Sequence, residues 1–73
     1  MTVKRERFVR LTEARVSKAL QAIRVIGNLA NKNNYEYTEA DLRKIVKALG
    51  TEIDGMASRF RNAESKARPA FKL

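Results

Sequence analysis

The sequence predicts an all-α fold: an antiparallel helical hairpin, completed as a four-helix-bundle-like dimer. Apolar residues recur at three- and four-residue spacings along two long stretches, which is typical of amphipathic helices. The only proline is Pro69, so neither stretch is interrupted by a residue that breaks helices. An Asn-rich run between the stretches indicates a turn.

The first helix is predicted over about residues 3–30. At 100° per residue its apolar side chains fall within about half of the circumference, a stripe wider than one neighbouring helix covers. These residues are Phe8, Val9, Leu11, Val16, Ala19, Leu20, Ala22, Ile23, Ile26, Leu29 and Ala30. The opposite side is rich in arginine and hydrogen-bonding groups, namely Arg7, Arg10, Ser17, Lys18, Gln21, Arg24 and Asn28.

A turn is predicted over residues 31–37, because asparagine tolerates left-handed backbone geometry and its side chain bonds its own backbone. The sequence from Thr38 to Asp41 then has the form of a capping box. Thr38 would accept from the backbone, and Asp41 would replace the usual glutamate three residues later. A second helix therefore begins at about residue 39.

The second helix is predicted over residues 39–63, with an apolar row whose spacing alternates between four and three residues. This row is coiled-coil-like and consists of Leu42, Val46, Leu49, Ile53, Met56, Phe60 and Ala63. Gly50, followed by a Thr51–Asp54 box, allows a break, although the constant phase of the row favours one continuous helix. Residues 1–63 thus form the hairpin, and residues 64–73 are expected to be a flexible basic tail.

A chain of 73 residues forms one domain with a small core, so its stability needs support. The chain has no cysteine and no histidine, which removes disulfides and the common structural metal sites. Self-association, or a protein partner that covers the wide apolar face of the first helix, is the remaining support. We expect a homodimer or such a complex.

The formal charge is +8, and it is uneven along the chain. Residues 1–30 hold seven basic and two acidic side chains, residues 31–60 hold five of each, and residues 61–73 hold four and one. A hairpin would gather the basic ends at one pole, where an anion relieves their repulsion. The predicted nucleic-acid-binding residues are Lys4, Arg5, Arg7, Arg10, Lys18, Arg24, Arg59, Arg61, Lys66 and Arg68.

Two further residues are candidates for contacts of another kind. Arg15 falls within the apolar half of the first helix, where it either lies at an edge with its charged head in water or sets a register or partner contact. Tyr35 lies in the turn and could stack on an unpaired base.

Catalysis and cofactor binding have little support in this sequence. Without His or Cys, and with the acidic groups near Thr38 and Thr51 explained as caps, no catalytic set, metal site or phosphate-cradling glycine loop is expected. No stretch has the length of a membrane span, and a cytoplasmic location is expected.

The predicted function is therefore nucleic-acid binding, to DNA or structured RNA, mainly through phosphate contacts. The alternative is a protein-interaction module, such as an accessory or inhibitor subunit of a larger protein or nucleoprotein complex.

Overall fold

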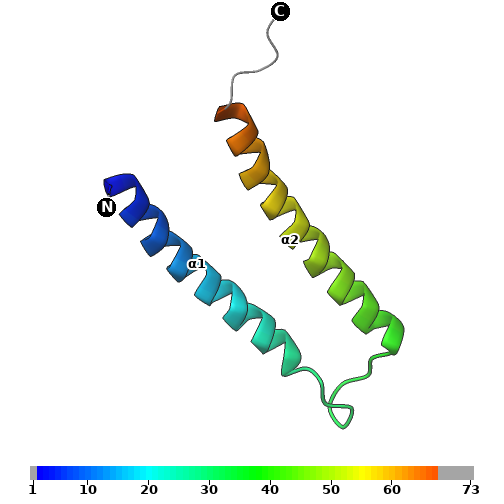
Figure 1. Cartoon of the computed structure of the whole chain (residues 1–73). Coiled ribbons are helices and arrows are strands. Elements are labelled where there is room, and N and C mark those ends of the chain that lie inside the picture. Colours follow the sequence, from blue (N-terminus) through cyan, green and yellow to red (C-terminus); the bar gives the residue numbers. More distant parts are fainter. Residues whose placement is uncertain (1, 68–73) are drawn as a thin grey trace, which may run out of the picture. The chain divides into compact units, whose positions relative to one another are not determined.

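The computed structural model describes the backbone of residues 2–67 and the side chains of residues 2–64. In this part of the chain there are two helices, α1 (Val3–Gly27) and α2 (Glu39–Ala67), and no strand (Figure 1). This confirms the predicted all-α class. The chain divides into two units, Met1–Glu36 and Tyr37–Leu73, each built around one helix.

α1 begins at a cap that the sequence analysis did not identify. Thr2 has extended backbone geometry, with φ −78° and ψ 158°, and its hydroxyl accepts from the Arg5 amide. The Arg5 N to Thr2 Oγ1 distance is 3.0 Å, and the Glu6 amide donates to the Thr2 carbonyl, also at 3.0 Å. Glu6 in the first turn and Arg24 in the last turn both complement the helix dipole.

α1 ends at Gly27, earlier than the expected end near residue 30. The amides of Asn28, Leu29 and Ala30 bond carbonyls three residues back, at 3.1, 3.0 and 3.0 Å. This tighter pattern closes the last turn. Leu29 and Ala30, which were predicted to extend the apolar stripe, therefore lie outside the helix.

The connecting segment is organised by Asn31. Its side-chain Oδ1 accepts from the Asn33 amide at 3.0 Å, as expected for an asparagine turn. Its carbonyl accepts from the amides of Asn34 and Tyr35, at 3.1 and 2.9 Å. No residue in the described part of the chain has positive φ, so the expected left-handed geometry is not used.

α2 begins at the predicted capping box. The Asp41 amide donates to Thr38 Oγ1 at 3.1 Å, and the Thr38 amide donates to Asp41 Oδ2 at 2.9 Å. The shorter Asp side chain thus completes the reciprocal pair that Glu usually forms. The Leu42 amide also donates to the Thr38 carbonyl, at 3.2 Å.

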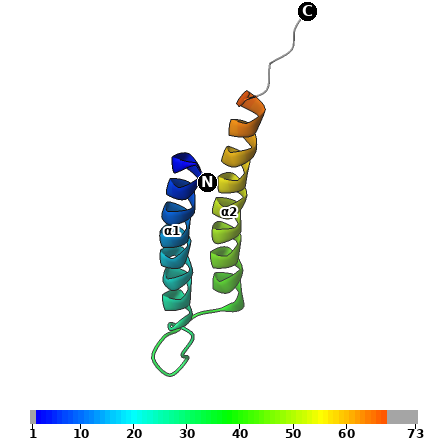
Figure 2. The ribbon, with the colours of Figure 1, turned by 60° about the vertical axis from the view of Figure 1, so that its left-hand side comes forward.

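α2 continues through Gly50 and Gly55 without a break (Figures 1 and 2). Thr51 and Asp54 consequently lie inside the helix and do not start a second one. The helix also continues to Ala67, past the expected end at residue 63. The first proline in the chain is Pro69, so no proline interrupts the helix before that point. Of the expected tail, residues 64–67 are thus helical, and residues 68–73 lie outside the described part.

No side chain between residues 2 and 64 is buried. Large apolar residues are exposed on both helices, for example Ile23 at 41% and Phe8 at 43% on α1, and Ile53 at 53% on α2. Each helix thus presents an apolar side. Helices in proteins gain most of their stability from the packing of such sides, and little from propensity alone.

We expect Thr38→Ala to lower the free energy of unfolding by about 1 kcal/mol, because the α2 amides lose their side-chain acceptor. Denaturant unfolding followed by circular dichroism measures the change. Thr51→Ala is the matched control, since Thr51 is exposed inside the helix and its replacement removes no cap. Equal losses in the two variants would contradict the continuity of α2.

Gly55→Ala should stabilise the protein by about 0.5–1 kcal/mol. A Cβ at this position has no neighbouring atom within 4 Å, and the glycine does not have positive φ. The same unfolding measurement tests this. A loss of helical content would mean that the chain needs glycine here for a bend.

Candidate nucleic-acid interface

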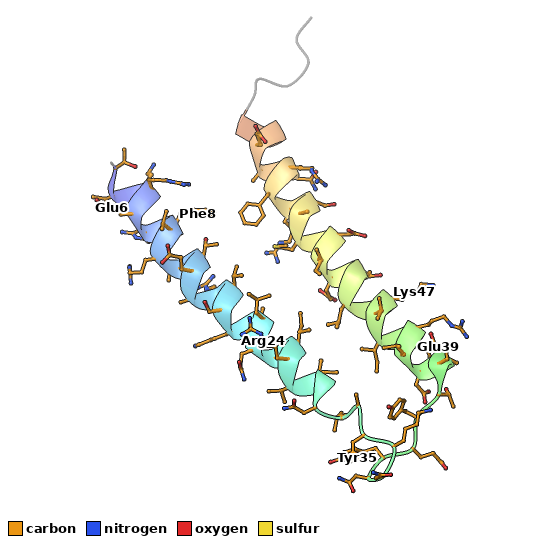
Figure 3. All side chains as sticks on the ribbon, turned by 60° about the horizontal axis from the view of Figure 1, so that its bottom comes forward. Glu6, Phe8, Arg24, Tyr35, Glu39 and Lys47 are labelled. Atoms are coloured by element: carbon orange, nitrogen blue, oxygen red, sulfur yellow. The ribbon has the colours of Figure 1, made fainter. Side chains whose placement is uncertain are left out.

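Four of the predicted basic residues form a row along one side of α1. Their positions fall within about a third of the helix circumference at 100° per residue. All four side chains are exposed, and Arg24 is labelled near the end of α1 in Figure 3. We call this set the α1 basic row; it comprises Arg7, Arg10, Lys18 and Arg24.

The first part of this row lines a shallow depression on α1. Val3, Glu6, Arg7 and Arg10 surround it, so two arginines and one glutamate share its lining. Glu6 also lies in the first turn, where a negative charge is favourable. This arrangement offers donors to a phosphate, but Glu6 offsets part of their charge.

Lys4 and Arg5 belong to the same end of α1 but lie outside the row. Arg5 is placed over the ring of Phe8, with its Cζ 5.7 Å from the ring centroid. This is the range of a cation–π interaction. Arg5 therefore covers part of an exposed aromatic ring on the apolar side of α1.

The remaining predicted basic residues belong to α2 and the residues that follow it. Arg59 and Arg61 are both exposed, but two residues of helix turn them to different sides. Lys66 lies in the last turn of α2, and Arg68 lies outside the described residues. The meeting of these residues with Lys4 to Arg10 at one pole stays a prediction.

A second basic row on α2 was missed by the sequence analysis. Arg61 shares one side of α2 with three other exposed cations, also within about a third of the circumference. The α2 basic row comprises Arg43, Lys44, Lys47 and Arg61, and Lys47 is labelled in Figure 3. The helical phase of these cations is the signal that reveals the row. Counting charge by segment did not reveal it, because residues 31–60 contain equal numbers of acidic and basic side chains.

Tyr35 and Arg15 are both exposed, as their proposed contacts require. Tyr35 is 49% exposed in the connecting segment, where its backbone is held by the Asn31 carbonyl. Figure 3 shows it in that segment. Arg15 is exposed and the neighbouring Thr12 is half-buried, which is compatible with either interpretation of Arg15.

Within the described residues, no three His, Cys, Asp or Glu side chains are grouped so that they could hold a metal ion. Neither of the two helices contains a stretch long and apolar enough to cross a membrane. The arrangement provides arrays of exposed hydrogen-bond donors with positive charge, and their chemistry is the binding of anions.

Comparison with known proteins adds no relative: no protein family, curated protein or solved structure matches this chain.

Proposed function

We propose that the protein is a non-enzymatic, cytoplasmic nucleic-acid-binding protein that acts as a dimer. Two hairpins would form a four-helix-bundle-like core, and basic side chains on its outside would hold the phosphate backbone of DNA or structured RNA. The observation that carries this proposal is the α1 basic row, four exposed cations on one side of a single helix.

The charge distribution supports phosphate contact more than base recognition. Residues 1–30 have five more basic than acidic side chains. On the same side of α1 as the α1 basic row, Ser17 and Gln21 provide neutral hydrogen-bond donors. Cations of this kind release counterions from a nucleic acid and bind without reading its sequence. The α2 basic row extends the set of possible phosphate contacts.

The exposed apolar sides of the helices support the dimer. A bundle buries such stripes between helices, and two copies of a two-helix chain supply the four helices that a bundle needs. The same surfaces also support a second candidate function, docking on another protein as an accessory or inhibitor subunit.

Binding to a short DNA or RNA duplex should weaken steeply between 50 and 200 mM salt. Replacing Arg10 and Arg24 with Gln should reduce the slope of log K against log salt by about 2, because each lost phosphate contact contributes about 0.9. Fluorescence anisotropy over a salt series measures both quantities.

Arg15→Gln is the matched control for this experiment. It removes one charge, as each of the two replacements does, but from the apolar half of α1, so the slope should stay unchanged. A slope that falls by about 0.9 in the control, as expected for one lost phosphate contact, would show that net charge matters and the row does not. Affinity that is flat with salt in the original protein would reject phosphate binding and leave the protein-docking function.

A further inference from the structure

The apolar row of α2 has the spacing of a helix that pairs with another helix. We call it the α2 seam; it contains Leu42, Val46, Leu49, Ile53, Met56, Phe60 and Ala63. The steps alternate between four and three residues, so the row returns to the same side every 3.5 residues on average. Its members are exposed apart from the half-buried Leu49, with Val46 60% and Phe60 56% exposed.

We infer that the α2 seam binds the α2 of a second copy in antiparallel orientation, with the twofold axis between Asp54 and Gly55. Counted outward from this point, the residue spacings within the seam are the same toward both ends of α2. Ile53 then faces Met56 of the second copy.

The outer layers follow from the same symmetry. Leu49 faces Phe60 of the second copy, and Val46 faces Ala63. Each layer occurs twice, once on either side of the axis. The large Phe60 and the small Ala63 thus meet side chains of intermediate size, which suits the interdigitation of a helix pair.

The charges beside the seam identify the second copy as the occupant. In an antiparallel pair, the residues on one flank of the seam lie against the residues on the same flank of the other copy. Glu52 then lies beside Arg59 of the second copy, offset by about 3 Å along the axis at 1.5 Å per residue. On the other flank, Arg43 lies beside Glu64 with the same offset. By symmetry, each opposite-charge pair forms twice.

A parallel pair of α2 helices has one such match instead of two. It would set Glu52 beside Ala57 and Arg43 beside Thr38, and only Arg59 with Glu64 would bring opposite charges together. Charges beside a helix seam select partner and orientation. All four flanking residues are exposed in the single chain, so they are available for these pairs.

This inference refines the dimer of the proposed function but does not depend on nucleic-acid binding. It assigns Arg43 and Arg59 to the contact between copies, whereas Lys44, Lys47 and Arg61 of the α2 basic row stay free of that contact. All measurements below use the full chain without nucleic acid. If the protein did not bind phosphate, these measurements of the dimer would be unchanged. If it did not dimerise, the monomer could still bind nucleic acid with an affinity that depends on salt.

Reversal of one charge should weaken the dimer, and reversal of both should restore it. In Glu52→Arg, two pairs that attracted now repel, and the dimer dissociation constant from sedimentation equilibrium should rise about tenfold. Arg59→Glu should act similarly. The double variant, Glu52→Arg with Arg59→Glu, should return to within about twofold of the original value.

Two controls carry the same charge changes on the outer side of α2. Asp54→Arg matches Glu52→Arg, and Arg61→Glu matches Arg59→Glu. Neither should change the dissociation constant beyond about twofold. Circular dichroism at equal concentration checks that each variant keeps its helix content. Failure of the double variant to recover, with helix content intact, would overturn the inferred pairing.

Engineered thiols test the orientation, because the chain has no cysteine of its own. A mixture of Val46→Cys and Ala63→Cys chains should oxidise to the mixed disulfide, since the two residues face each other. Val46→Cys alone should not form a disulfide-linked dimer, because its two copies lie about 25 Å apart along the axis, beyond the reach of a disulfide. A disulfide dimer of Val46→Cys alone, or a chain that stays monomeric, would overturn the inference.

Discussion

The proposed assembly depends on the burial of the apolar sides of α1 and α2. α1 and α2 are helices of 25 and 29 residues, and no described side chain on either of them is buried. Hydrogen bonds at the helix ends define where each helix starts, but they do not supply the free energy that apolar burial supplies. The proposed dimer and the outward position of the basic rows follow from this requirement, whereas the charges beside the α2 seam determine the proposed orientation.

On each helix, the apolar residues and the basic row lie on different sides. On α2 the proposed seam occupies one side, with Arg43 on its flank, and Lys44, Lys47 and Arg61 lie on the side away from it. In the proposed dimer the same helix can therefore bind a second copy and an anion together. On α1 the basic row is likewise distinct from the apolar half, apart from Arg5 over Phe8 and the exposed Arg15. Because burial and charge occupy different sides, a change in one need not disturb the other.

Local features were predictable from the sequence, and features that depend on distant residues were less so. The Thr38–Asp41 box was found because both of its hydrogen bonds join residues three apart. The Thr2 cap was missed because no acidic residue stands at its third position to mark it. The end of α1 was placed too late, since the switch to three-residue bonding leaves no mark in the apolar pattern.

The candidate site shows the same division. The α1 basic row could be predicted from helical phase alone, but Arg5 on the ring of Phe8 could not, because side-chain rotamers decide that contact. The α2 basic row was overlooked because charge was counted by segment and not by side. The proposed meeting of the two basic ends depends on the arrangement of separate units, which periodicity within one helix does not determine.

The continuity of α2 through Gly50 has a consequence for how the molecule assembles. A stop there would have left two short helices, each able to find its own neighbour and each too short to be stable alone. One unbroken helix keeps every apolar layer in the same phase, so docking of the first layers aligns all the others. In the proposed dimer this couples folding and association into one cooperative step, without a partly paired intermediate.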